Sequence, residues 1–280
     1  MNAVRWRWMG FGRRVSSALT GYPRLRWRVF RFFSALGRRM GRAERRWVTV
    51  RSGARFRLDL DDPLQEQLFV YGEYSRPEIE RLIRNLRPGD VFVDVGANIG
   101  LFSVEIGRHV GSRGRVVAIE PAADSARLAS EHVAINELQD VVEVHELALG
   151  EREDQLTLFA PADDPLDVGR RSLLGSDGSA VGTVAVRSLD GLVATGGLDL
   201  PEVHAIKIDV EGYEVAALRG MRATIEGCRP RIVLVETVIA NLARAGSEVV
   251  EIDDLMRSFG YRRLPGDPEN AAYVPGGSDD

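Results

Sequence analysis

The stretch Arg87-Pro-Gly-Asp-Val-Phe-Val-Asp-Val-Gly-Ala-Asn-Ile-Gly100 decides the predicted fold. It opens with a Pro-Gly-Asp turn, and Val91 to Val95 is an apolar run that fits a strand buried on both faces. Gly96, Asn98 and Gly100 then predict a tight bend into a helix. A strand, a glycine-rich bend and a helix in this order are typical of a nucleotide-binding turn, because the free N–H groups and the positive dipole end of the helix face the ligand.

This bend departs from the fingerprint of dinucleotide-binding proteins. A Gly-x-Gly-x-x-Gly turn leaves space for a pyrophosphate, but here Asp94 ends the strand and Asn98 stands near the position of the middle glycine. A carboxylate beside the ligand suits a cation, and S-adenosylmethionine carries a sulfonium and an ammonium group and no phosphate. The pattern therefore favours this cofactor over NAD. The structural alternative is that the glycines only form the turn and that Asp94 only caps the helix.

The chain on both sides of this stretch alternates between predicted strands and helices. The helices are expected at residues 101–110, 122–136, 215–226 and 248–260, and the further strands at 115–120, 141–146, 205–209 and 231–236. This rhythm predicts an α/β fold with a doubly wound, mostly parallel sheet that binds ligands at the carboxyl ends of its strands. Residues 261–264 and 271–274 are expected to add an antiparallel C-terminal edge.

Five acidic residues fall at the carboxyl ends of predicted strands: Asp94, Glu120, Asp209, Glu211 and Glu236. Glu120 lies 26 residues beyond Asp94, where an acid binds the hydroxyls of a ribose. Asp209 and Glu236 form the natural oxygen pair for a divalent metal, but two acids are a small ligand set, so whether a metal is needed stays open.

Lys207 is the only lysine of the chain, and a two-residue period places it on the same strand face as Asp209. A compact ammonium differs from a guanidinium, so Lys207 is a candidate for the catalytic site. The alternative is a buried pair with Asp209 that only orders the end of the strand. The four histidines show no metal-ligand or nucleophile spacing.

Two further segments are assigned to the site by their position. Ala148 follows the third strand, where backbone groups line an adenine site in this architecture. Residues 160–182 form a long polar span between two short strands, 155–159 and 183–186, and a span of this length is typical of a binding loop or lid. We therefore expect it to be a flap over the substrate, with Arg170 to Leu173 facing the site.

Charge divides the chain unevenly. Residues 1–46 contain 13 arginines and one acid, Glu44, whereas the remaining residues contain 24 basic and 40 acidic side chains. Aromatic residues are interleaved with these arginines. This predicts a basic extension with three open interpretations: a disordered or loosely helical arm, a membrane-surface helix, or a nucleic-acid arm. Membrane contact is favoured over nucleic acid because Phe30, Phe33 and Leu36 share one helical face.

Four segments follow from these patterns: the basic extension at 1–46, a hairpin and helical lead-in at 47–86, the ligand-binding domain at 87–275 and a tail at 276–280. One cysteine, Cys228, excludes an intramolecular disulfide and is typical of a reducing compartment. No long uncharged apolar run predicts a membrane span or a signal peptide. We expect a cytoplasmic protein, with the inner face of the membrane as a hypothesis for the extension.

Six blocks resemble the FkbM family of S-adenosylmethionine-dependent methyltransferases: residues 94–100, 119–121, 148–150, 186–190, 206–214 and the strand ending at Glu236. The resemblance covers about residues 68–264, and Lys207-Ile-Asp-Val-Glu-Gly212 is its most specific part. It implies a class I methyltransferase fold, O-methylation of hydroxyls on sugars, glycolipids or polyketides, and cofactor binding by Asp94, Gly96, Asn98, Gly100 and Glu120. The family's Tyr-Glu-Pro-Glu motif appears only loosely, as Tyr74-Ser-Arg-Pro-Glu78, and no catalytic residue carries over.

The sequence therefore predicts an S-adenosylmethionine-dependent O-methyltransferase in which Asp209 or Glu211 removes the proton of a hydroxyl acceptor. Two alternatives remain at this point. One is an NAD-dependent oxidoreductase on the same sheet, and the other is a non-catalytic cofactor-binding module that docks on a membrane or RNA. A nucleic-acid acceptor is not expected, because Asp209-Val-Glu-Gly212 stands where adenine methylation needs an Asn/Asp-Pro-Pro-aromatic motif.

Overall fold

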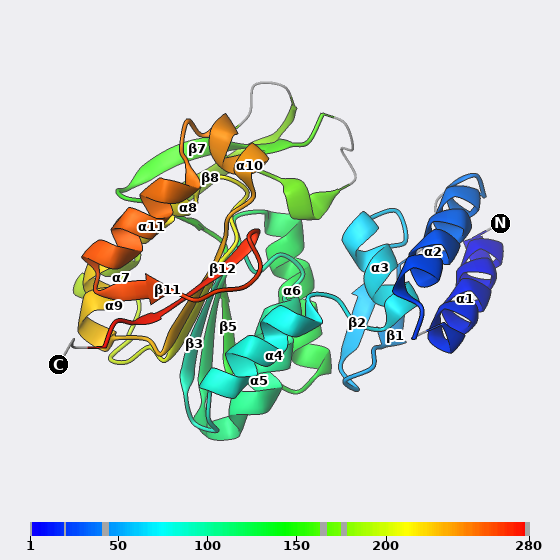
Figure 1. The fold of residues 1–280 in the computed structure, drawn as a ribbon, viewed down its shortest axis with the longest axis horizontal. Helices are drawn as coiled ribbons and strands as arrows, with labels where there is room; N and C mark the ends of the chain where they lie inside the picture. The colour runs from blue at the N-terminus through cyan, green and yellow to red at the C-terminus, as the bar shows by residue number, and fades with distance from the viewer. Residues whose placement is uncertain (1, 20, 41–44, 163–166, 175–177, 278–280) are drawn as a thin grey trace. The chain divides into compact units, whose positions relative to one another are not determined.

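The computed structural model describes residues 2–19, 21–40, 45–162, 167–174 and 178–277 (Figure 1). The chain divides into two compact units, Met1–Arg76 and Pro77–Asp280. The boundaries expected from the sequence, after residues 46, 86 and 275, stay predictions. The division falls at Arg76 because the basic extension packs on the segment that follows it and forms one unit with it.

A seven-stranded sheet forms the centre of the second unit, in the order β11-β12-β10-β9-β3-β4-β5 (Figure 1). Its strands are β3 (Val91–Val95), β4 (Arg115–Ile119), β5 (Val142–His145), β9 (Ala205–Ile208), β10 (Ile232–Glu236), β11 (Tyr261–Arg263) and β12 (Asn270–Pro275). The five strands from β10 to β5 are parallel, and β12 is antiparallel to β10 and to β11. The predicted mostly parallel sheet, with its antiparallel C-terminal edge, is confirmed.

Helices cover both faces of this sheet, as expected for a doubly wound fold (Figure 1). On one side are α4 (Arg76–Asn85), α5 (Leu101–Val110) and α6 (Ala123–Ile135), and on the other are α7 (Leu189–Ala194), α8 (Glu214–Arg219), α9 (Arg222–Cys228) and α11 (Val249–Ser258). The β3 residues Val93 and Val95 are fully buried in a core that also contains apolar side chains of α8, α9 and α11. All five residues of β3 are buried, so the apolar run in the sequence is a strand covered on both faces.

Chain order reverses at the centre of the sheet, between β3 and β9. From β3 the chain continues to β4 and β5 on one side, and from β9 to β10 on the other. Such a reversal leaves a crevice at the carboxyl ends of the two central strands, which is where open α/β sheets bind ligands. The glycine bend after β3 and the acidic segment after β9 both lie at this position.

A second, three-stranded sheet has the order β6-β8-β7 and consists of β6 (Ala148–Leu149), β7 (Asp154–Ala160) and β8 (Ser179–Arg187). Strand β8 starts four residues earlier than the sequence predicted, because Ser179 to Thr183 pair with β7 and so lengthen the ladder. The flap between β7 and β8 contains the short helix η2 (Val168–Arg170), and residues 163–166 and 175–177 of the predicted flap lie outside the described residues. The short helices η1 (Gly111–Arg113) and α10 (Ile239–Arg244) complete this unit.

The first unit contains α1 (Asn2–Ala18), α2 (Pro23–Arg38), β1 (Arg46–Thr49), β2 (Arg55–Leu58) and α3 (Pro63–Tyr71). Strands β1 and β2 form the predicted hairpin. Helices α1 and α2 contact each other and both contact α3. Phe30 and Phe33 are buried by these contacts, so the membrane face that the sequence predicted for them is wrong.

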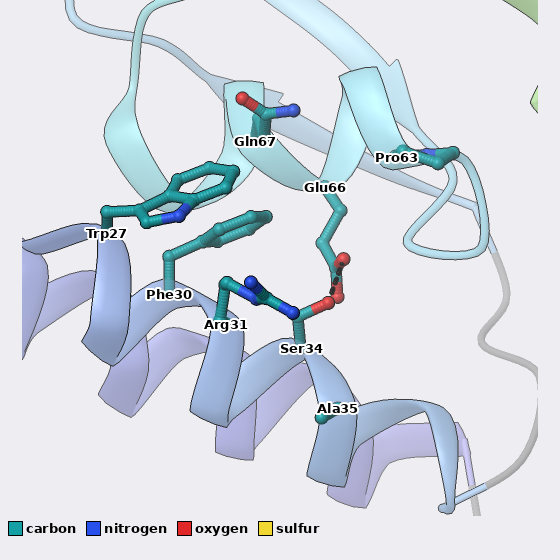
Figure 2. Close-up of a pocket in the computed structure, with 8 residues that line it drawn as sticks. All are labelled: Trp27, Phe30, Arg31, Ser34, Ala35, Pro63, Glu66 and Gln67. Atoms are coloured by element: carbon teal, nitrogen blue, oxygen red, sulfur yellow. Dashed lines mark hydrogen bonds between the residues drawn. The ribbon is translucent and has the colours of Figure 1, made fainter.

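Between α2 and α3 lies a cavity of about 280 Å³ (Figure 2). Trp27 and Phe30 of α2 form one wall, with their ring centroids 5.4 Å apart, and Pro63 and Glu66 lie on α3. Ser34 donates a hydrogen bond of 2.6 Å to the buried carboxylate of Glu66. In the described part of the chain no helix is both long enough and apolar enough to cross a bilayer.

Candidate active site

The glycine bend brings two segments that are distant in sequence into direct contact. Gly96 has a φ of +78°, and a Cβ atom there would lie 1.8 Å from the backbone oxygen of Asp209. Only glycine tolerates both this backbone conformation and this approach. The bend after β3 therefore touches the end of β9, which joins the two predicted parts of the site.

Asn98 and Glu120 hold the bend against the end of β4. Asn98 has a left-handed φ of +51°, and its backbone N–H donates a hydrogen bond of 2.7 Å to Glu120. The other carboxylate oxygen of Glu120 accepts from the N–H of Ala122 at 2.8 Å. Burial raises the pKa of Glu120 to about 7, although these two N–H groups act in the opposite direction. Glu120 thus orders the bend while it keeps lone pairs for a further donor.

The side-chain oxygen of Asn98 is buried and has no hydrogen-bond partner among the described residues. A buried acceptor without a donor is costly and usually marks a place where a ligand or water completes the contact. Asn98 stands in the predicted cofactor-binding turn. Its orphaned oxygen is therefore an observation that fits a ligand with a hydrogen-bond donor at this position.

Asp94 is fully buried, so its carboxylate is directed into the protein. It accepts a hydrogen bond of 2.6 Å from Ser103 in the first turn of α5 and lies 3.5 Å from the ammonium of Lys207. In this conformation Asp94 positions the turn and the lysine. The prediction that Asp94 contacts the cofactor directly stays a prediction.

Lys207 links the glycine bend to the acidic segment. Its ammonium donates a hydrogen bond of 2.7 Å to the carbonyl of Gly96 and lies 3.3 Å from the carboxylate of Asp209. Burial by itself lowers the pKa of Lys207, but Asp209 and Asp94 outweigh it and hold the pKa above its ordinary value. Its ammonium therefore stays protonated at neutral pH, which fits the alternative that Lys207 orders the end of the strand. The catalytic role of Lys207 stays a prediction.

Three carboxyl groups meet beside this lysine. Asp209, Glu211 and Glu236 each offer an oxygen, and these oxygens lie within 4.8 Å of one another. Burial and the Asp209 carboxylate raise the pKa of Glu211 to about 8. Burial, Asp209 and Glu211 raise the pKa of Glu236 to about 10. At neutral pH this cluster therefore retains protons that isolated carboxyl groups would have lost.

Two neighbours of the carboxyl cluster were not identified from the sequence. Asn241 of α10 donates hydrogen bonds to Glu211 at 2.8 Å and to Glu236 at 3.2 Å. Glu214 accepts from the backbone N–H groups of Val210 and Gly212, both at 3.1 Å, and so shapes the loop that carries Glu211. The sequence pattern did not identify Asn241 as a site residue, because Asn241 lies 30 residues beyond Glu211 on a separate short helix.

The flap between β7 and β8 is fixed at two points of the site. Arg171 forms a bidentate pair with Asp124 at the start of α6, with one hydrogen bond of 3.0 Å. The hydroxyl of Ser172 donates a hydrogen bond of 2.8 Å to the backbone oxygen of Glu211. Two of the predicted flap residues thus contact segments that follow β4 and β9.

Ala148 is buried in β6, and its strand pairs with β8. Ala148 lies three residues after the end of β5, and the sequence also placed it after the third strand. A backbone contact from Ala148 to an adenine ring stays a prediction.

Comparison with known proteins agrees with this arrangement. The model of the methyltransferase FkbM domain matches residues 94–263, which is more than half of the chain. This match begins at Asp94 and includes the glycine bend, Lys207 and the carboxyl cluster. The chain belongs to the FkbM family of S-adenosylmethionine-dependent methyltransferases.

A curated relative is the AMB antimetabolite synthetase AmbE of Pseudomonas aeruginosa, which is 30% identical over 258 residues. The match covers 78% of this chain and only 12% of the length of AmbE.

Among solved structures, the methyltransferase FkbM of Methylobacillus flagellatus has a TM-score of 0.46 at 17% identity and matches 75% of this chain and 52% of its own. The O-methyltransferase TomG of Streptomyces achromogenes, solved with S-adenosylmethionine, has a TM-score of 0.43 at 17% identity and matches 73% of this chain and 82% of its own.

Proposed function

We propose that this protein transfers a methyl group from S-adenosylmethionine to a hydroxyl oxygen of a sugar, glycolipid or polyketide-type natural product. The carboxyl cluster at the ends of β9 and β10 is the observation that carries this proposal. A hydroxyl acceptor must lose its proton as the new bond forms, and a base works best when its pKa lies near the operating pH. Glu211, with a pKa of about 8, meets that condition.

The residues around the glycine bend suit the cofactor. The orphaned oxygen of Asn98 and the remaining lone pairs of Glu120 offer acceptors for its amino and hydroxyl groups. Gly96 and Gly100, both with a φ of +78°, let the backbone turn into α5 without side chains in the way. When bound, S-adenosylmethionine supplies an electrophilic methyl group on a positively charged sulfur.

The acidic segment after β9 has a separate part in the reaction. Glu211 takes the proton of the acceptor hydroxyl, and Asp209 is the second candidate for this role. Lys207 acts as a positioning residue, because its ammonium fixes both Asp209 and the carbonyl of Gly96. Alignment of the acceptor oxygen with the methyl carbon, at about 3 Å and with water excluded, is expected to supply most of the acceleration.

Protons, rather than a divalent metal, are the proposed occupants of the carboxyl cluster. The structure brings together Asp209, Glu211 and Glu236, one acid more than the pair predicted from the sequence. Burial and mutual repulsion raise the pKa of two of them, so that without a bound metal protons relieve the repulsion. The ammonium of Lys207, 3.3 Å from Asp209, also repels a second cation. Transfer is therefore expected to be insensitive to chelators.

The choice of a natural product as acceptor rests on a family resemblance and on one relative. AmbE is named as an antimetabolite synthetase, and this chain resembles a part of that protein. Membership in a methyltransferase family also argues against the alternative that the protein is an NAD-dependent oxidoreductase. The alternative of a module without turnover predicts cofactor affinity in the absence of methyl transfer.

The test is to incubate the full chain with methyl-labelled cofactor and separate lipid, glycan and small-molecule pools from cell extract. Each pool is tested with and without chelator. Base-stable label in a hydroxyl-bearing compound, unaffected by the chelator, supports the proposal. Label on nitrogen or carbon, or cofactor binding without transfer to any pool, contradicts it.

A further inference from the structure

The two N-terminal helices leave an apolar surface exposed along the seam between them. On α1, Val4 and Phe11 are 56% and 51% exposed, and on α2, Leu25 and Phe32 are 46% and 59% exposed. Val4 and Phe11 are seven residues apart, as are Leu25 and Phe32, so each pair lies on one helical face. Exposed apolar side chains gathered in this way typically mark an interaction site.

Aromatic contacts show that the two faces are continuous. Phe11 and Phe32 lie on different helices, but both pack on the buried ring of Phe33, with centroid distances of 5.8 and 5.6 Å. Trp8 of α1 also contacts Phe32, at 6.3 Å. Phe33 is thus a common contact of Phe11 and Phe32, and these two exposed rings form one surface across both helices. We call the set Val4, Phe11, Leu25 and Phe32 the seam surface.

Arginines stand beside the seam positions on both helices, Arg7 and Arg14 on α1 and Arg24 and Arg28 on α2, whereas Arg31 of α2 lines the cavity between α2 and α3. All five are exposed. The guanidinium of Arg14 lies over the ring of Phe11, 6.0 Å from its centroid. Within the described residues, none of the five forms an ion pair with a carboxylate. The nearby acids pair with other arginines: Arg5 pairs with Asp61, Arg45 with Asp59 and Arg51 with Glu73.

We infer that the seam surface, with the arginines beside it, docks the protein on an anionic phospholipid bilayer. An interfacial helix pair buries its apolar face by about 5–10 Å at the headgroup boundary, while cationic side chains contact anionic headgroups. The membrane-facing residues inferred here differ from those predicted from the sequence, Phe30, Phe33 and Leu36. In the structure Phe30 and Phe33 are buried and Leu36 is partly buried.

Other partners fit the same surface less well. In a two-fold pair of copies, the arginines beside the seam surface of one chain would face those of the other, and like charges oppose such an interface. A nucleic-acid backbone matches the arginines but offers no apolar layer for Val4, Leu25 and the phenylalanines. An anionic bilayer supplies both the charge and the apolar layer.

The test is cosedimentation of the full chain with phosphatidylcholine vesicles that contain or lack phosphatidylglycerol. Binding to the anionic vesicles is expected, and salt should weaken it. The pair Phe11→Ser/Phe32→Ser is expected to reduce partitioning by at least about tenfold. Val4→Ser/Leu25→Ser is a second variant that leaves the ring contacts intact and should act in the same direction. Val250→Ser, at a position 53% exposed on α11, is the matched control.

Arg7→Gln/Arg28→Gln is expected to weaken binding to anionic vesicles by about 30-fold, with Arg113→Gln/Arg262→Gln as the control at exposed arginines elsewhere. Circular dichroism and cofactor affinity verify that each variant is folded. Failure of the wild-type chain to bind anionic vesicles overturns the inference. The inference is also overturned if both apolar variants bind the anionic vesicles as strongly as the wild-type chain does. A dimer or an RNA complex that depends on the seam surface, in a protein that does not bind vesicles, overturns it as well.

Discussion

Glu211 is the residue on which the proposed chemistry depends. Its pKa of about 8 has two causes that the sequence did not reveal, namely burial and the contact with Asp209 across a bend. The strand-end rule placed Asp209, Glu211 and Glu236 at one edge of the sheet. It did not show that their oxygens would lie within 4.8 Å of one another, because that depends on how the loop after β9 turns.

The raised pKa gives a prediction for the Glu211→Gln variant. The base form of Glu211 appears as the pH rises through about 8, so wild-type kcat should increase across that range. Glu211→Gln should lower kcat by about 10²- to 10⁴-fold and remove this rise, while cofactor affinity stays unchanged. Single-turnover methyl transfer measured from pH 6 to pH 10 verifies it, with Glu226→Gln as the control at an exposed glutamate. An unaltered pH profile in Glu211→Gln would assign the base to Asp209.

A second prediction at the residue scale concerns the close approach at Gly96. Gly96→Ala should destabilise the protein by at least about 3 kcal/mol, because the new Cβ meets a backbone oxygen and the φ is strained. Gly111→Ala is the matched control, since Gly111 has a φ of +69° but open space around its Cβ position. The control should lose only about 1 kcal/mol. Equal losses in urea denaturation would show that the approach to Asp209 is not tight.

At the scale of elements, the alternation of apolar runs and helical stripes predicted each strand of the parallel sheet and the helices α5, α6 and α11. The single helix predicted at 215–226 is two helices, α8 and α9, and α7 was not predicted. Local pattern was sufficient there because both faces of these strands are buried. The α1–α2 pair was not predictable in the same way. Packing against α3 decides which aromatic residues of this pair are buried. The spacing of residues along one helix does not show which of its faces will pack against another helix.

The flap supplies the prediction at this scale. Arg171 and Asp124 form a bidentate pair that connects the flap to α6, and such charge-assisted pairs are stronger than neutral hydrogen bonds. Arg171→Met should therefore make the 160–182 segment about tenfold more sensitive to limited proteolysis and should raise the KM for the acceptor. Arg170→Met, a change at the neighbouring and more exposed arginine, is the control. Unchanged cleavage within the flap would mean that Ser172 alone holds it.

For the whole molecule, the buried acids of the site predict how stability varies with pH. Burial raises the pKa of Glu120 and of Glu214 to about 7, and those of Glu211 and Glu236 are higher still. The folded state therefore binds more protons than the unfolded state above the ordinary glutamate pKa, and stability must fall as the pH rises. We expect the free energy of unfolding to decrease by at least about 3 kcal/mol between pH 5 and pH 9, since one pKa unit is worth about 1.4 kcal/mol and the pKa of Glu120 alone is raised from 4.5 to about 7.

Urea denaturation at several pH values measures this slope. Glu211→Gln/Glu236→Gln should flatten it, because two of the groups that take up protons are then absent. Stability that is constant or rises from pH 5 to pH 9 would show that these acids are ionised in the folded protein.

The central claim is that the bend after β3 holds S-adenosylmethionine, with the amide of Asn98 as one of its contacts. Calorimetric titration of the full chain with S-adenosylmethionine, compared for wild type and Asn98→Gly, tests this most directly. Glycine keeps the left-handed backbone at a φ of +51° and removes only the side chain. We expect saturable binding by wild type and about tenfold weaker binding by Asn98→Gly, whose thermal stability should be unchanged. No binding by wild type, or equal affinity in both proteins, would contradict it.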